Sequence, residues 1–186
     1  MSLQRCGWAN AANPLYLKYH DQEWGVPCHD ELRLFEMLNL EGAQAGLSWE
    51  TVLNKRENYR LAFDAWDAKK IALYDEEKVA GLMQNAGIIR NRLKIQAVIS
   101  NAKAYLQLCA ECGGLDVYLW KHVQGTPIVN NGERIVTTDL SDQISKDLKK
   151  RGFKFVGSTI IYAYMQAIGM VNDHVHDCAW RQTPVA

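Results

Sequence analysis

Hydrophobic residues recur at intervals of three and four along most of the chain, which is the spacing of helices with one apolar face. Behind Glu31, positions Leu32, Phe35 and Leu38 follow this spacing together with Asn39. A second stripe consists of Trp49, Val52, Leu53, Tyr59 and Phe63. Both stripes predict amphipathic helices that share a core.

Helix-capping residues place further helices in the first half of the chain. Asp67 precedes AKKIALY and Asp75 precedes EEKVAGLMQNAG, and aspartate is a favoured N-cap. Gly87 is expected to end the second of these helices. The longest helical pattern covers residues 88–108, and a Gly-Gly pair at 113–114 ends it.

The second half of the chain contains one segment of a different kind. A shorter helix is predicted over 114–124, but residues 127–138, PIVNNGERIVTT, place Asn-Gly between two β-branched pairs. This is a hairpin signal. Because an isolated hairpin is marginally stable, we expect a plain or partly extended loop.

Two helices follow this loop, one beginning at Ser141 and one buried between Gly157 and Gly169. The chain therefore predicts an all-α protein of about eight to ten short helices. Its 186 residues suit one compact domain, or one core split into two lobes.

Charge and composition narrow the possible partners. Lys+Arg and Asp+Glu balance at 21 each, so any attraction to nucleic acid must come from local patches. No apolar run approaches the roughly 20 residues of a membrane-spanning helix, and the start lacks the apolar stretch of a secretory signal. We expect a cytoplasmic protein with no membrane partner. Five cysteines then favour reduced thiols or metal ligands.

The segment NDHVHDC, residues 172–178, concentrates metal-ligating side chains near the C-terminus. On a helix, His174 and Cys178 would share one face, whereas His176 would point about 160° away. Two ligands do not complete a structural metal site.

Two pairs of residues could complete such a site. One pair is Cys6 with His20, and the other is Cys109 with Cys112 in a CAEC motif, the commoner spacing for zinc. Spacing alone leaves both open.

Several longer motifs resemble the bacterial 3-methyladenine DNA glycosylase I family. They are RCGW, YHDQEWGVP, LFEMLNLEGAQAGLSWETVLNKRENYR, AGIIRNRLKIQAVISNA, LKKRGFKFVGSTIIYAYMQAIGMVNDH and the terminal HxxxC. They occur in the family's order over nearly the whole chain, and residues 109–139 are the least similar. The resemblance implies a helix-hairpin-helix glycosylase fold, with 1–186 as a single glycosylase domain of two helical lobes.

The same resemblance selects among the metal-ligand candidates. It implies that Cys6, His20, His174 and Cys178 bind one structural Zn²⁺, with His176 outside the site. Four protein ligands close a tetrahedron and leave no position for an activated water. Such a zinc ion would act as a staple between the N- and C-terminal segments.

The resemblance also implies a pocket for a base flipped out of duplex DNA. Its expected residues are Trp8, Tyr19, Trp24, Glu41 and Trp49. An N3-alkylated adenine is cationic, so aromatic faces and the Glu41 carboxylate favour it over ordinary adenine. We assign Glu41, the expected catalytic residue, mainly to recognition and electrostatic stabilisation, and secondarily to water activation.

DNA contacts are expected at the hairpin, residues 148–169. The basic residues there are Lys149, Lys150, Arg151 and Lys154, and a second basic group is Arg90, Arg92 and Lys94. Leu47, in the turn AGLSW, is the expected wedge that fills the gap left by the flipped base.

The sequence departs from the wider superfamily in two ways. The hairpin glycines are spaced more widely than G-x-G, and Asp173, directly before a zinc-ligand candidate, is no clear equivalent of the superfamily's catalytic aspartate. No lysine is suited to form a Schiff base, so we expect hydrolysis of 3-methyladenine from duplex DNA by a monomer, without strand cleavage, and free 3-methyladenine as product.

Two other functions compete with this one. A zinc-stapled helical DNA-binding module without catalysis would explain the zinc ligands and basic patches but leave Glu41 and the aromatic residues as packing. A redox or metal-transfer protein using CAEC would leave the full-length resemblance as coincidence.

Overall fold

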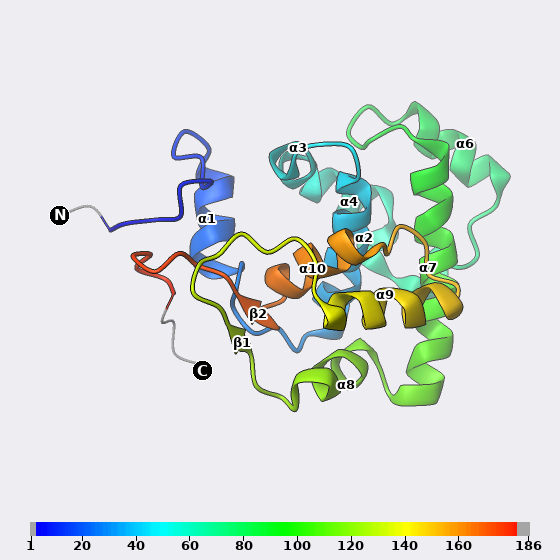
Figure 1. The fold of residues 1–186 in the computed structure, drawn as a ribbon. Coiled ribbons are helices and arrows are strands. Elements are labelled where there is room, and N and C mark those ends of the chain that lie inside the picture. The colour runs from blue at the N-terminus through cyan, green and yellow to red at the C-terminus, as the bar shows by residue number, and fades with distance from the viewer. Residues whose placement is uncertain (1–2, 182–186) are drawn as a thin grey trace.

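Helices dominate the computed structural model, which describes residues 3–181 (Figure 1). The α-helices are α1 (Pro14–Gln22), α2 (Glu31–Gln44), α3 (Trp49–Asn54), α4 (Arg56–Ala62), α5 (Ala68–Ile71), α6 (Glu76–Gln84), α7 (Arg92–Cys112), α8 (Leu115–Trp120), α9 (Asp139–Lys150) and α10 (Ser158–Ala167). Short 3₁₀ helices cover Asp64–Trp66 and Lys121–Val123. The predicted all-α class is confirmed. Within 3–181, no helix has the length and apolarity needed to cross a membrane.

Helix α2 lies at the centre of the molecule. Every residue from Leu34 to Ala43 is buried, so this helix is enclosed on all sides rather than amphipathic. Leu32, placed on its apolar stripe by the sequence, is instead 54% exposed. Helices α3, α7, α8 and α10 pack around α2, and the Tyr164 hydroxyl of α10 donates to the Leu34 carbonyl. Polar residues on α2 are therefore held in fixed positions.

Capping explains where most helices begin. Asp67 and Asp75 accept hydrogen bonds from backbone N–H groups in the first turns of α5 and α6, as predicted. Helix α6 ends at Gln84, before Gly87, and α7 begins only at Arg92, after the N-cap Asn91.

Two further helices differ from the sequence pattern. The stripe from Trp49 to Phe63 forms two helices, α3 and α4, which meet at Lys55. Helix α1 was not predicted, although Asn13 followed by Pro14 is a helix-start signal.

The expected loop at 127–138 is confirmed as partly extended. Its strand β1 (Ile128–Val129) pairs in parallel with β2 (Val171–Asn172), with Ile128 opposite Val171. No hairpin forms within this loop, which the structure describes throughout. The pairing places the loop beside the C-terminal segment that carries His174.

Helices α9 and α10 form the predicted hairpin. Thr138 and Ser141 form a reciprocal capping box at the start of α9, so the helix begins slightly before the expected Ser141. Gly152 has φ +96° in the turn, and α10 starts directly after Gly157. The Ser145 hydroxyl donates to the Val156 carbonyl and closes the hairpin turn, residues 151–157, onto α9.

Candidate functional site

Four buried metal-ligating side chains converge from the two ends of the chain. Cys6, His20, His174 and Cys178 each offer a ligand atom, and these atoms all lie within 4.8 Å of one another. His174 Nδ1 lies 3.4 Å from the Cys6 sulfur and 3.3 Å from the Cys178 sulfur, while His20 Nε2 lies 3.6 Å from the Cys178 sulfur. We call these four residues the Cys2His2 cluster.

The spacing of the Cys2His2 cluster fits a tetrahedral metal ion. With ordinary zinc-to-sulfur and zinc-to-nitrogen bond lengths, a tetrahedral site separates sulfur from nitrogen by about 3.5 Å. The observed separations match this value. The donor set therefore suits a closed structural metal site with four protein ligands.

Hydrogen bonds orient both imidazoles toward the centre of the cluster. His20 Nδ1 lies 2.7 Å from the Asp21 carboxylate, and His174 Nε2 lies 3.0 Å from the Trp24 carbonyl. Each nitrogen acts as the donor to its oxygen, so the other nitrogen of each ring presents a lone pair toward the cluster. Arg5 pairs with Asp21 in turn.

The backbone around His174 differs from the sequence prediction. Residues 174–178 are not helical, and His174 and Cys178 meet through a turn in which the Cys178 N–H donates to the Val175 carbonyl. Cys109 and Cys112 lie at the end of α7, outside the cluster. The geometry thus favours Cys6 and His20 as the completing pair.

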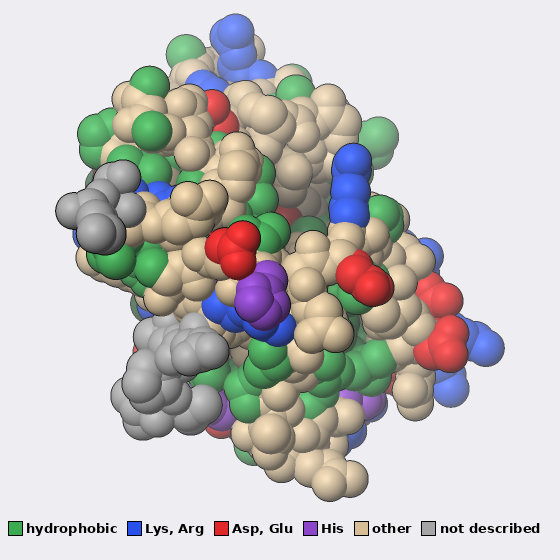
Figure 2. All heavy atoms as spheres, turned by 60° about the vertical axis from the view of Figure 1, so that its left-hand side comes forward, with side chains coloured by type: hydrophobic (Ala, Val, Ile, Leu, Met, Phe, Trp, Pro, Cys, Tyr) green, Lys and Arg blue, Asp and Glu red, His purple; other side chains and the backbone are tan. Residues whose placement is uncertain are grey.

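An open cleft of about 630 Å³ lies beside the cluster. Figure 2 shows the face that carries the terminal segments, which is hollowed near its centre. All five expected pocket residues line the cleft: Trp8, Tyr19, Trp24, Glu41 and Trp49. This volume is in the range of small-molecule sites and is lined by several aromatic rings.

Aromatic contacts connect the cleft to the Cys2His2 cluster. The rings of Trp8 and Trp24 meet edge to face at 4.7 Å, and Trp8 lies 5.1 Å from the His20 ring. On the other side, Tyr19 lies 5.1 Å from Trp49. A metal ion that fixes the histidines would therefore also fix part of the cleft wall.

Glu41 reaches the cleft from the enclosed helix α2. It is 3% exposed, and burial raises its pKa to about 8. Near neutral pH the free protein therefore holds Glu41 mainly as a neutral carboxylic acid. A cationic ligand beside it would favour the ionised form.

Other cleft residues were missed by sequence reasoning. They are Tyr16, Gln44, Gly132, Glu133, Arg134, Ile135, Ala163, Gln166, Asp173 and Val175. Asp173 accepts hydrogen bonds from Tyr162, Gln166 and Asn130 at 2.6–2.7 Å, so its carboxylate is held by neighbours from α10 and from the loop at 127–138. The loop at 127–138 gave no sequence signal for the cleft, because contacts with segments distant in sequence bring it there, among them the pairing of β1 with β2 and the bond from Asn130 to Asp173.

The expected DNA-contacting residues occupy two kinds of environment. Lys149, Lys150 and Lys154 are exposed at the hairpin. Arg151 is already paired with Asp147 at 2.8 Å and Glu111 at 2.7 Å, so phosphate binding would require it to exchange these partners.

The second basic group is only partly directed outward. The Lys94 ammonium donates to the Ala43 and Ala45 carbonyls at 2.8 and 2.6 Å, so this member of the second basic group is directed inward. Arg92 pairs with Glu76. Leu47 is 42% exposed in the turn after α2, as a wedge requires.

A helical hairpin and an aromatic cleft with a buried carboxyl are the features that the resemblance to a DNA glycosylase family led us to expect. A family model described as methyladenine glycosylase matches residues 8–182. The chain belongs to the methyladenine glycosylase family.

Three relatives extend this comparison. DNA-3-methyladenine glycosylase 1 of Escherichia coli strain K12 is 53% identical, covering 95% of this chain and 96% of the relative. A crystal structure of 3-methyladenine DNA glycosylase I is 52% identical with a TM-score of 0.91, covering 95% and 98%. A third, a variant of 3-methyladenine DNA glycosylase I in complex with 3-methyladenine, is 35% identical with a TM-score of 0.92, covering 96% and 98%.

Proposed function

We propose that this protein excises 3-methyladenine from alkylated duplex DNA by hydrolysing the bond between the base and deoxyribose. The observation that carries the proposal is the buried carboxyl of Glu41, set among the aromatic rings of a cleft that suits a single base. The relatives named above support the choice of base. The product would be free 3-methyladenine and a DNA strand with an abasic site.

Recognition would follow from the positive charge of the damaged base. The aromatic faces of Trp8, Tyr19, Trp24 and Trp49 attract a cation by about 0.5 to 2 kcal/mol per good contact. Ordinary adenine is neutral and gains none of this. Glu41 would accept a hydrogen bond from the base and, once ionised by the nearby cation, add negative potential.

Bond breakage needs little further activation in this site. The alkylated base leaves with the bonding electron pair and becomes neutral, and water adds to the cationic sugar carbon and releases a proton to solvent. Glu41 would stabilise the positive charge that develops on the sugar. Among the described residues that line the cleft there is no lysine, which supports water rather than an enzyme amine as the nucleophile.

Zinc is the metal that the Cys2His2 cluster suits best, since two thiolates and two imidazoles are a standard zinc donor set. Cys6 and His20 come from the N-terminal segment, and His174 and Cys178 from the C-terminal one. The ion would hold these segments together and would take no part in bond breakage.

DNA would lie across the hairpin, with its backbone near Lys149, Lys150 and Lys154. Backbone amides at the start of α10 suit a phosphate. Leu47 would fill the space that the flipped base leaves in the duplex. Arg151 would join these contacts by exchanging its present carboxylate partners.

The decisive experiment is incubation of the protein with methylated duplex DNA, followed by chromatographic identification of every released base. Release of 3-methyladenine above the spontaneous rate is expected. A protein that binds the duplex with full zinc content but releases no base would instead be the non-catalytic binding module.

A further inference from the structure

The hairpin turn, residues 151–157, is fixed against the same helix that carries Glu41. Asn101 of α7 is 3% exposed and bonds both backbone polar groups of Lys154: its Oδ1 accepts from the Lys154 N–H at 2.7 Å, and its Nδ2 donates to the Lys154 carbonyl at 3.2 Å. A single side chain therefore clamps the tip of the turn.

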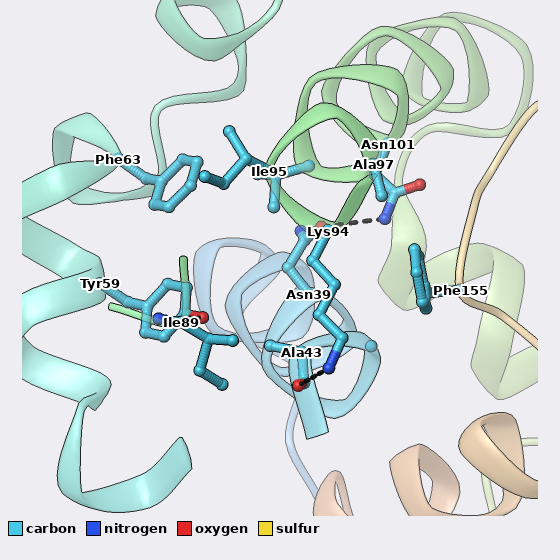
Figure 3. Close-up of a pocket in the computed structure, with 12 residues that line it drawn as sticks. Asn39, Ala43, Tyr59, Phe63, Ile89, Lys94, Ile95, Ala97, Asn101 and Phe155 are labelled. Atoms are coloured by element: carbon cyan, nitrogen blue, oxygen red, sulfur yellow. Dashed lines mark hydrogen bonds between the residues drawn. The ribbon is translucent and has the colours of Figure 1, made fainter. Parts of the chain in front are cut away.

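The clamp continues into α2. Asn101 Nδ2 also donates to Asn39 Oδ1 at 2.9 Å, and the Asn39 amide donates to the Phe35 carbonyl. Figure 3 shows Asn101 and Asn39 meeting between their helices, with Phe155 beside them. Because these polar groups are buried and mutually satisfied, breaking one bond would leave others unpaired.

Phe155 supplies the second contact between the turn and α2. It has φ +53°, a left-handed conformation that costs free energy for a residue with a side chain. Its Cβ lies so close to α2 that a Cβ added at Gly42 would stand 3.1 Å away, tighter than ordinary contact. At Gly42 the turn therefore leaves less room than an ordinary Cβ contact needs.

Gly42 directly follows Glu41 in the sequence. Glu41 lines the cleft, whereas Gly42 lines a separate, nearly filled cavity together with Phe155 and Asn101. The contact between Gly42 and Phe155 thus sets the distance between the hairpin turn and the Glu41 carboxyl, because Glu41 and Gly42 are neighbours on α2.

Lys94 holds the C-terminal end of α2 in place. Its ammonium donates to the Ala43 and Ala45 carbonyls and so satisfies acceptors at the C-terminus of α2. The turn that follows carries Leu47. Gly42 therefore lies between Glu41 and Leu47 in the sequence. A shift of the backbone at Gly42 would move both of these residues.

From this geometry we infer that Asn101, Phe155 and Gly42 are positioning residues that set the distance between the DNA backbone bound at the hairpin and the flipped base held at Glu41. The inference rests on the proposed function. One DNA molecule must engage both surfaces at once, so a small displacement of the hairpin misplaces the sugar, while a free base, which touches only the cleft, is unaffected.

The test uses Gly42→Ala, whose added methyl group should push the turn outward by a few tenths of an ångström. We expect single-turnover excision from duplex DNA to fall by about tenfold, since displacements below 1 Å already cost rate in oriented reactions. Affinity for free 3-methyladenine should stay within about twofold. Gly81→Ala, at a helical glycine with open space around it, is the matched control and should change neither quantity.

A double-variant cycle separates positioning from general damage. In the Phe155→Gly background the added methyl group has room, so Gly42→Ala should then change the excision rate by less than about twofold. Asn101→Ala, which removes the clamp from the other side, should lower the excision rate and leave free-base affinity unchanged.

Three results would overturn the inference: an undiminished rate in Gly42→Ala, a parallel loss of free-base affinity, or the same loss of rate in the Phe155→Gly background. If the wild-type protein releases no base, the proposed function fails instead. The positioning inference is then decided by affinity for a duplex with a stable abasic analogue, which Gly42→Ala should lower only when Phe155 is present.

Discussion

The imidazole of His174 makes two contacts with Trp24, one with its backbone carbonyl and one with its indole ring. Its Nε2 donates to the Trp24 carbonyl at 3.0 Å, and the two rings lie edge to face with centroids 4.7 Å apart. Trp24 lines the cleft, and His174 belongs to the Cys2His2 cluster. The cluster and the cleft therefore share a wall.

Metal content tests the ligand assignment. Purified protein should contain one zinc ion per chain, and Cys178→Ser should lose it because three remaining ligands leave the tetrahedron open. Cys112→Ser is the control, since Cys112 lies outside the cluster. Metal analysis of the three proteins is the measurement. Full zinc in Cys178→Ser together with loss in Cys112→Ser would reverse the assignment.

Glu41 is tested by comparing glutamine with alanine. Glu41→Gln keeps a carbonyl acceptor, so single-turnover excision should fall by less than the roughly hundredfold expected for loss of an obligatory general base. Affinity for free 3-methyladenine should fall in parallel. Glu41→Ala should cost a further 1 to 3 kcal/mol, roughly the penalty for a buried partner left unpaired.

Rates and base-binding titrations on these two variants distinguish the roles of Glu41, provided that zinc content and melting temperature are retained. Abolished catalysis in Glu41→Gln with undiminished base binding would show that Glu41 activates water.

The raised pKa of Glu41 predicts a pH dependence of stability. Burial raises this pKa from 4.5 to about 8, so between these values the native state holds a proton that the unfolded chain releases. The Glu41 contribution to the free energy of unfolding must then decrease as pH rises from about 4.5 to 8. Glutamine does not titrate. The stability of wild type relative to Glu41→Gln should therefore decline over this window, by an amount on the order of a few kcal/mol.

Denaturant unfolding of both proteins at pH 5, 6.5 and 8 would measure this difference. A constant difference across the three pH values would show that Glu41 is ionised in the free protein throughout.

The chemistry of the cleft predicts a monofunctional enzyme. Because no lysine lines the cleft among residues 3–181, borohydride should trap no covalent adduct between protein and DNA. The product strand should stay intact at the abasic site until it is treated with alkali. Denaturing gel electrophoresis detects both outcomes, and an adduct that maps to a lysine would contradict the proposed nucleophile.

Salt dependence tests the hairpin as the DNA-binding surface. If Lys149 and Lys150 each contact a phosphate, replacing either by alanine should make the slope of log affinity against log salt shallower by about 0.9. Lys94→Met is a useful comparison. Its ammonium faces backbone carbonyls, so its loss should leave the slope unchanged even if stability falls. An unchanged slope in both hairpin variants would place the DNA elsewhere.

Local sequence patterns determined most of the helices of this protein and many of the residues of its cleft and cluster. The 3.6-residue period and the caps at Asp67 and Asp75 specify helices, because their energetics depend on residues only a few positions apart. The motifs around Glu41 and the terminal histidines, through their resemblance to a family, also named the cleft and cluster residues that the structure brings together.

The tertiary structure alone decided relationships that span the chain. Helix α2 has a pattern that resembles an amphipathic helix, but its neighbours enclose it, and only that enclosure raises the pKa of Glu41. In the sequence Lys94 belongs to a basic group, but in the structure its ammonium binds the carbonyls of Ala45 and Ala43, which lie 49 and 51 residues away. Likewise the contact of Phe155 with Gly42 spans more than half the chain. Burial and contacts of this kind depend on which segments meet in space, and residue spacing along the chain does not encode that.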